Sequence, residues 1–181
     1  MTRAAARRRR TSGQTLAEFA IVAPIFFLLL FSVVQFGLIM AAQNGLVDGV
    51  RDAARRAATY RINGASFDIS VFPAICQAID GDLETRLKSE VIGYAKVNRT
   101  RSIVYEWQQN PGSGEYFLVA HIKAWYRNPL YVPLVSYFLD SIDTTVDGKL
   151  TLTAEEQMRV ENPVLDDPGS YAAHDCAAYL P

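Results

Sequence analysis

An uncharged apolar segment near the N-terminus constrains the fold of this chain more than any other feature. The segment runs from Phe19 to Ala42. Its only interruptions are Pro24, Ser32, Gln35 and Gly37. Two dozen helical residues rise roughly 36 Å, which is enough to cross the hydrocarbon core of a bilayer, about 30 Å thick. The sequence therefore predicts one transmembrane helix over about 19–42.

Charge is distributed unevenly around this segment. Residues 1–13 hold five arginines and no acidic residue, and the remainder of the chain holds 13 basic against 19 acidic residues. An acidic body argues against binding of nucleic acid, which requires a basic surface. Taken alone, the arginine run would also be compatible with an RNA-binding patch or a nuclear localisation signal. Its place directly before an apolar segment instead favours a cytoplasmic N-terminus and an extracytoplasmic body.

The helical pattern continues beyond Ala42. Small and apolar residues recur every three or four positions, at 46, 50, 53, 54, 57 and 58. This spacing is typical of an amphipathic helix. We therefore expect one long helix over 14–61, half in the membrane and half outside it. Pro24 predicts a kink, and Gly45 and Gly49 lower the helix propensity.

The following region, 62–161, combines helical and strand patterns. Asn63-Gly64 predicts a turn. The sequence predicts a second helix over 74–96, which Asp82 could cap. Alternation of apolar and polar residues predicts strands over 102–108, 116–127 and 149–161. The apolar segment 129–142 is either a short helix over the sheet, which we prefer, or an exposed contact surface. Residues 162–181 have the composition of an irregular tail. The predicted class is α+β, with a small antiparallel sheet.

Residues able to carry out chemistry are sparse. The two histidines, His121 and His174, do not stand at metal-ligand spacing from the cysteines, and no phosphate-binding loop or nucleophile elbow occurs. We therefore expect no enzyme, no catalytic residue, no metal site and no cofactor. Cys76 and Cys176 are the only cysteines. In an extracytoplasmic domain such a pair predicts one disulfide, and the alternative is two unpaired core residues.

A more specific pattern precedes the apolar segment. Gly13 is followed by QTLAEF, with the basic leader on one side and the apolar segment on the other. This arrangement resembles the processing signal of type IV prepilins. In that family a prepilin peptidase cuts after the glycine, and the mature chain has glutamate at its fifth position with an aromatic residue next. The resemblance implies that Gln14 becomes the N-terminus and that Glu18 and Phe19 take part in assembly.

Within that family, the chain is similar to the TadE-like pseudopilins (minor pilins) of tight-adherence, or Flp, pilus systems. The similar segments are LAEFAIVAPIFFLLLFSVVQFG, AAQNGLVDGVRDAARRAA and LTLTAEEQMRVENP. Major Flp pilins are much shorter, which favours a TadE, TadF or TadG type. The resemblance implies a pilin-like extracytoplasmic domain and a single-pass protein of the bacterial inner membrane that takes part in pilus assembly and adhesion. The implied partners are the prepilin peptidase, other pilin and pseudopilin subunits, the assembly machinery and the lipid bilayer.

Other interpretations of the N-terminus stay open. A single-pass anchor could carry an extracytoplasmic binding domain unrelated to pili. A Sec signal peptide cut near 39–41 would release a soluble domain, but it would leave Glu18 unexplained. A twin-arginine signal is poorly supported, because Thr11-Ser12-Gly13 follows the arginines where apolar residues are expected. Processing after Gly13, an uncleaved anchor and cleavage near 39–41 each predict a different first residue of the mature protein.

Overall fold

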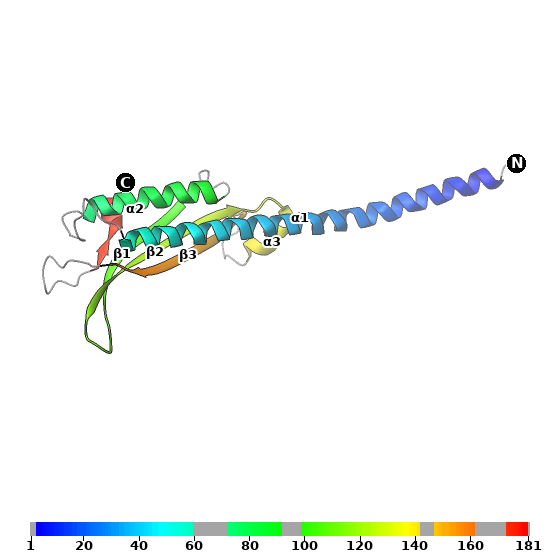
Figure 1. Ribbon diagram of the computed structural model, residues 1–181. Helices are drawn as coiled ribbons and strands as arrows, with labels where there is room; N and C mark the ends of the chain where they lie inside the picture. Colours follow the sequence, from blue (N-terminus) through cyan, green and yellow to red (C-terminus); the bar gives the residue numbers. More distant parts are fainter. Residues whose placement is uncertain (1–2, 60–71, 92–98, 142–146, 162–172, 181) are drawn as a thin grey trace.

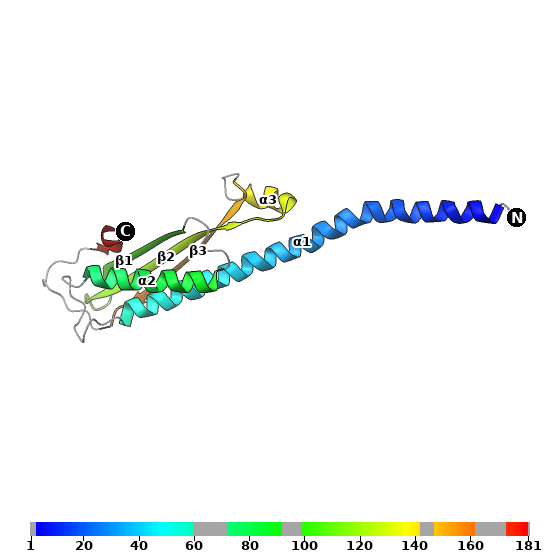
Figure 2. The same ribbon diagram turned by 90° about the horizontal axis from the view of Figure 1, so that it is seen from above.

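Helix α1 (Arg3–Thr59) dominates the computed structural model, which describes residues 3–59, 72–91, 99–141, 147–161 and 173–180 (Figure 1). The helix contains 57 residues, and at the usual rise it is about 85 Å long. Its N-terminal half projects away from the rest of the molecule, and its C-terminal half lies along the folded body (Figures 1 and 2). The predicted long helix is therefore confirmed, and it extends through the basic leader as far as Arg3.

The helix passes through Pro24 without interruption. Figure 2 shows a bend between its projecting part and the part on the body. Proline supplies no N–H to the helix, and Ser32 Oγ donates to the Leu28 carbonyl at 2.7 Å. Both features favour curvature. Pro24 therefore does not end the helix, and Ser32 is a second residue that favours a bend.

The body contains a four-stranded antiparallel sheet in the order β3-β2-β1-β4. The strands are β1 (Arg99–Gln109), β2 (Tyr116–Pro129), β3 (Lys149–Arg159) and β4 (His174–Asp175). The three predicted strands correspond to β1, β2 and β3, and the α+β class is confirmed. β1 is longer than predicted because it pairs with β2 over its whole length, from Arg99 opposite Tyr126 to Gln109 opposite Tyr116.

The hydrophobic core lies between the helices and one face of the sheet. Helix α1 contributes Ala42, Leu46, Val50, Ala53, Ala54 and Ala57. Helix α2 (Phe72–Glu90) and the strands supply the larger side chains, among them Phe72, Ile79, Leu83, Leu87, Ile103, Tyr105, Ile122 and Tyr126. The small residues of α1 let it approach the sheet and α2 closely. The C-terminal part of α1, from Ala42 onward, thus contributes to the core of the folded body.

Contacts between α1 and α2 give Gly49 and Asp82 roles that differ from those expected. A Cβ on Gly49 would lie 2.9 Å from Leu87 Cδ2, so this glycine permits close helix packing. Asp82 does not cap the second helix, which begins at Phe72. Its carboxylate instead accepts a hydrogen bond from Arg56 Nη1 of α1 at 2.7 Å. The predicted turn at Asn63-Gly64 and the predicted end of this helix over 92–96 lie outside the described residues.

Tyr105 of β1 connects the sheet to the last turns of α1 by a hydrogen bond. Its side chain is fully buried, and its hydroxyl donates to the Ala57 carbonyl at 3.4 Å. Burial raises the pKa of the phenol above its ordinary value of about 10. The hydroxyl therefore keeps its proton and remains a hydrogen-bond donor.

Two short helical segments complete the described structure. Helix α3 (Pro133–Asp140) forms within the apolar segment 129–142 and lies at the end of the sheet nearest the projecting half of α1 (Figures 1 and 2). The C-terminal residues, for which the sequence predicted an irregular tail, form β4 beside β1 and a 3₁₀ helix, η2 (Cys176–Tyr179). Residues 162–172 of that tail lie outside the described residues.

Candidate functional site

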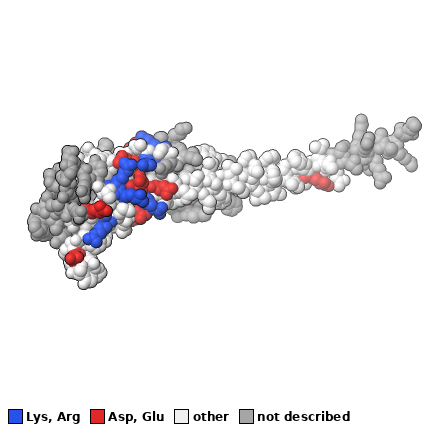
Figure 3. Space-filling view, in the orientation of Figure 1, with Lys and Arg blue, Asp and Glu red and all other residues white. Residues whose placement is uncertain are grey.

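The N-terminal half of α1 presents a carboxylate on an otherwise apolar surface. Glu18 is the only charged residue from Gly13 to Val47. Its Oε1 accepts a hydrogen bond from Gln14 Nε2 at 3.1 Å, one helical turn earlier. Both side chains are exposed. Figure 3 shows the described part of the projecting rod as a surface almost without charge, with one acidic spot near the end of that described part.

The side chains that follow Glu18 leave a continuous apolar surface uncovered by the body. Phe19 is 68% exposed, and Val22, Ile25, Phe26 and Leu29 are exposed to a similar degree. In the described part of the chain, α1 is the one helix long and apolar enough to cross a membrane, and only 6% of its apolar window is buried. A core helix of a soluble protein would be mostly buried. The exposed half of α1 therefore has the surface of a single-pass membrane anchor.

Cys76 and Cys176 are joined by a disulfide in the structure, with their Cα atoms 5.4 Å apart. Cys76 lies on α2 and Cys176 opens η2, and both are fully buried. The bridge attaches the C-terminal segment to α2 across a sequence separation of 100 residues. Phe72 strengthens this attachment, because its ring packs against those of His174 and Tyr179.

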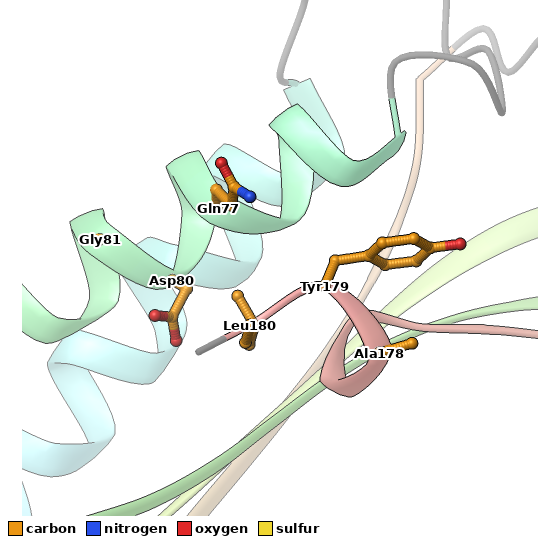
Figure 4. A pocket seen from close by; sticks show the side chains of 6 residues that line it. All are labelled: Gln77, Asp80, Gly81, Ala178, Tyr179 and Leu180. Atoms are coloured by element: carbon orange, nitrogen blue, oxygen red, sulfur yellow. The ribbon is translucent and has the colours of Figure 1, made fainter.

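A groove of about 610 Å³ lies beside this bridge, between α2 and η2 (Figure 4). It is lined by Gln77, Asp80, Gly81, Ala178, Tyr179 and Leu180. Its carboxylate, Asp80, is already paired with Arg101 of β1, which donates to it through both Nε and Nη2. The same guanidinium lies 3.3 Å from Glu84 Oε2. Among the described residues that line the groove, the one carboxylate is therefore paired with a cation.

The histidines are not placed together. His121 Nε2 lies 3.3 Å from Gln108 Nε2 and 3.5 Å from Glu106 Oε2 on the outer face of the sheet. His174 packs against Phe72, near the disulfide. Within the described ranges, no group of three His, Cys, Asp or Glu side chains is placed to hold a metal ion.

Gln35 is a polar residue whose contact the sequence did not indicate. It lies within the apolar segment of α1 but is only 1% exposed. Its Oε1 accepts a hydrogen bond from the backbone N–H of Tyr131 at 2.9 Å, just before α3. The two residues are 96 positions apart, so no local pattern in the sequence could have paired them.

The segment that carries the predicted processing and assembly residues also matches a known family. Residues 13–55 match the sequence model of the TadE-like protein family. No curated protein and no solved structure matches the chain. The match begins at Gly13, includes the whole exposed apolar surface and ends inside the part of α1 that forms the core. The resemblance to TadE-like proteins seen in the sequence is therefore confirmed over residues 13–55.

Proposed function

We propose that the protein is a minor pilin, or pseudopilin, of a tight-adherence (Flp) pilus. The TadE-like match implies a protein associated with Tad pili. In our proposal a prepilin peptidase removes residues 1–13, and the mature chain is held in the bacterial inner membrane by α1 with its body outside the cytoplasm. The chain then joins other pilin subunits during assembly of an adhesive pilus.

One observation carries this proposal. The helix that carries the Gly13–Phe19 pattern continues without a break into the core of the α+β body. An ordinary anchor needs no glutamate at the edge of its apolar segment and no rigid connection to its domain. A subunit that packs by its N-terminal helix needs both, because the helix must present its body at a fixed height and angle.

Glu18 has a specific role in this proposal. Cleavage after Gly13 would create an α-amino group on Gln14, whose side chain already reaches the Glu18 carboxylate. A neighbouring subunit staggered along the bundle could bring its own α-amino group to Glu18. A carboxylate in a low-dielectric bundle is unfavourable unless it is paired. The pair would therefore favour the correct stagger over others.

N-terminal sequencing of the membrane-extracted protein tests the processing step. We expect the mature chain to begin at Gln14, and we expect Gly13→Leu to retain the leader because the leucine side chain would obstruct the peptidase. Gly37→Leu is a matched control on the same exposed surface, where a Cβ has nothing within 4 Å. Normal shortening of Gly13→Leu would refute the processing step. A mature chain that begins at its original Met would favour the alternative function, an anchored extracytoplasmic binding domain.

Glu18→Gln tests the assembly step separately. This change keeps the size of the side chain and removes its charge. We expect the variant to be cleaved and inserted but not incorporated into pili or into complexes with other subunits. Asp48→Asn is the control, because Asp48 lies on the same helix beyond the apolar segment. Wild-type piliation by Glu18→Gln would remove Glu18 from the assembly mechanism.

A further inference from the structure

We propose that the segment from Leu130 to Ser141, which includes α3, is a second membrane-contacting element. In this proposal the segment rests in the lipid–water interface on the side of the bilayer where the body lies, and its docking on Gln35 sets how deeply the body sits. The proposal requires only that α1 crosses a membrane. It does not depend on leader cleavage or on pilus assembly.

The depth of the contact on α1 is the first argument. From Phe19, where the apolar segment begins, to Gln35 the helix advances by about 24 Å, and a hydrocarbon core is about 30 Å thick. If the helix enters the hydrocarbon at Phe19, Gln35 lies within about 6 Å of its far edge. The hydrogen bond from Tyr131 N–H to Gln35 Oε1 holds the α3 segment at that level.

The exposed side chains of the segment are the second argument. Tyr131 is 68% and Tyr137 74% exposed, more than the other exposed aromatic residues in the described part of the body, Tyr116 at 41% and Tyr179 at 40%. Tyrosine is enriched at membrane interfaces, where its ring contacts lipid and its hydroxyl contacts water. Val135 is buried toward the body. The segment therefore has one residue packed against the protein and two tyrosines exposed on its surface.

The position of the segment is the third argument, and it favours lipid over a second copy of the chain. α3 lies at the end of the sheet that faces the projecting half of α1 (Figures 1 and 2), so the segment that contains it lies next to the part of α1 that leaves the body. In the view of Figure 3 the charged side chains gather over the body, away from the projecting rod. The only charged residue of α3 is Asp140, at the C-terminal end of the helix. A short apolar helix at this level is suited to lie along the membrane surface.

Site-directed spin labelling of the full chain tests this inference. Tyr137→Cys places a nitroxide on α3, and Tyr116→Cys places one at the start of β2, next to the β1–β2 turn. Each labelled protein is reconstituted in vesicles of phosphatidylcholine and phosphatidylglycerol. We measure collision of the label with oxygen, which concentrates in lipid, and with a water-soluble nickel chelate. The ratio of the two should be several-fold higher at position 137 than at position 116.

A second variant tests the role of Gln35. Gln35→Leu removes the acceptor of the Tyr131 N–H, and we expect the ratio at position 137 to fall toward the value at position 116. An equal, water-like ratio at both positions in the unaltered background would overturn the proposal. So would a label at 137 that is shielded from both reagents, because that result would show a protein partner on this surface. An unchanged ratio in Gln35→Leu would overturn the claim that this contact sets the depth.

Discussion

Gly49 and Gly81 are two helical glycines in opposite surroundings. Gly49 of α1 faces the buried side chain of Leu87, whereas a Cβ on Gly81 of α2 would meet nothing within 4 Å. Alanine stabilises an exposed helix interior by up to about 1 kcal/mol relative to glycine. Overpacking of a core costs about 1 to 3 kcal/mol.

We therefore expect Gly81→Ala to raise the free energy of unfolding and Gly49→Ala to leave it unchanged or lower it. Gly49→Val, which adds two further methyl groups, should lower it clearly. Urea titration followed by circular dichroism measures all three. A gain for Gly49→Ala equal to that for Gly81→Ala would show that Leu87 moves aside at no cost.

Arg101 and Asp80 form the most buried ion pair among the described residues. Their side chains are 15% and 9% exposed. Removing one partner of a buried pair costs about 3 to 5 kcal/mol, because the other charge stays buried without compensation. We expect Asp80→Ala to lower the free energy of unfolding toward the low end of that range, since Glu84 also contacts the guanidinium.

The exposed pair of Lys123 and Glu155 is a matched comparison. Its nitrogen and oxygen lie 3.1 Å apart, but both side chains are 46% exposed. Glu155→Ala should therefore change the free energy of unfolding by about 1 kcal/mol or less. Similar losses for Asp80→Ala and Glu155→Ala in the same denaturation experiment would mean that burial does not decide the strength of these pairs.

Among the elements, the C-terminal segment depends most on one covalent bond. β4 is two residues long, and η2 is a single turn. Elements this short are not stable by themselves. The Cys76–Cys176 disulfide and the ring of Phe72 hold them against α2 and β1.

Replacing both cysteines with alanine should detach this segment. The chain-entropy estimate for so long a loop is about 4 to 5 kcal/mol, and measured losses are usually 2 to 4 kcal/mol. Hydrogen exchange should accelerate at residues 174–179 by more than it does in β1 and β2. Equal acceleration across the body would show that the bridge stabilises the whole fold and not this segment. Alkylation without reductant, followed by intact-mass measurement, checks the pairing itself, because two alkylated thiols in the native protein would refute it.

The sequence predicted those elements whose pattern is local. Spacing of three and four placed the amphipathic part of α1, and alternation placed β1, β2 and β3. It placed the start of the second helix at residue 74, two residues after Phe72, but the role of Asp82 as a cap was wrong, because in the fold its carboxylate pairs with Arg56. It also missed β4 and the contact of Gln35 with Tyr131, since both depend on segments far apart in the chain. Glu18, Phe19 and Gly13 could be singled out because they form one short pattern.

At the scale of the whole molecule, anchor and body share a helix but not a core. The core residues that α1 contributes begin at Ala42, and only Ile39 packs against them from within the projecting half. A fragment that begins at Ala41 should therefore fold without the membrane segment and unfold cooperatively. A fragment that begins at residue 60 should not, because it lacks Leu46, Val50 and the alanines beside them. Thermal denaturation by circular dichroism separates the two, and cooperative unfolding of the shorter fragment would contradict this assignment of the core.

Because α1 is continuous, each residue between the membrane segment and the body also sets how the body is rotated about the helix axis. Each residue of an α-helix turns the chain by about 100° and advances it by about 1.5 Å. One extra residue after Met40 would raise the body by only about 1.5 Å but would rotate its sheet by about 100° about the helix axis. Four extra residues would restore the direction to within about 40° while lifting the body by about 6 Å. The length of this helix thus encodes an azimuth as well as a height, and partners that meet the body from a fixed side would tolerate changes in helical turns better than changes of one residue.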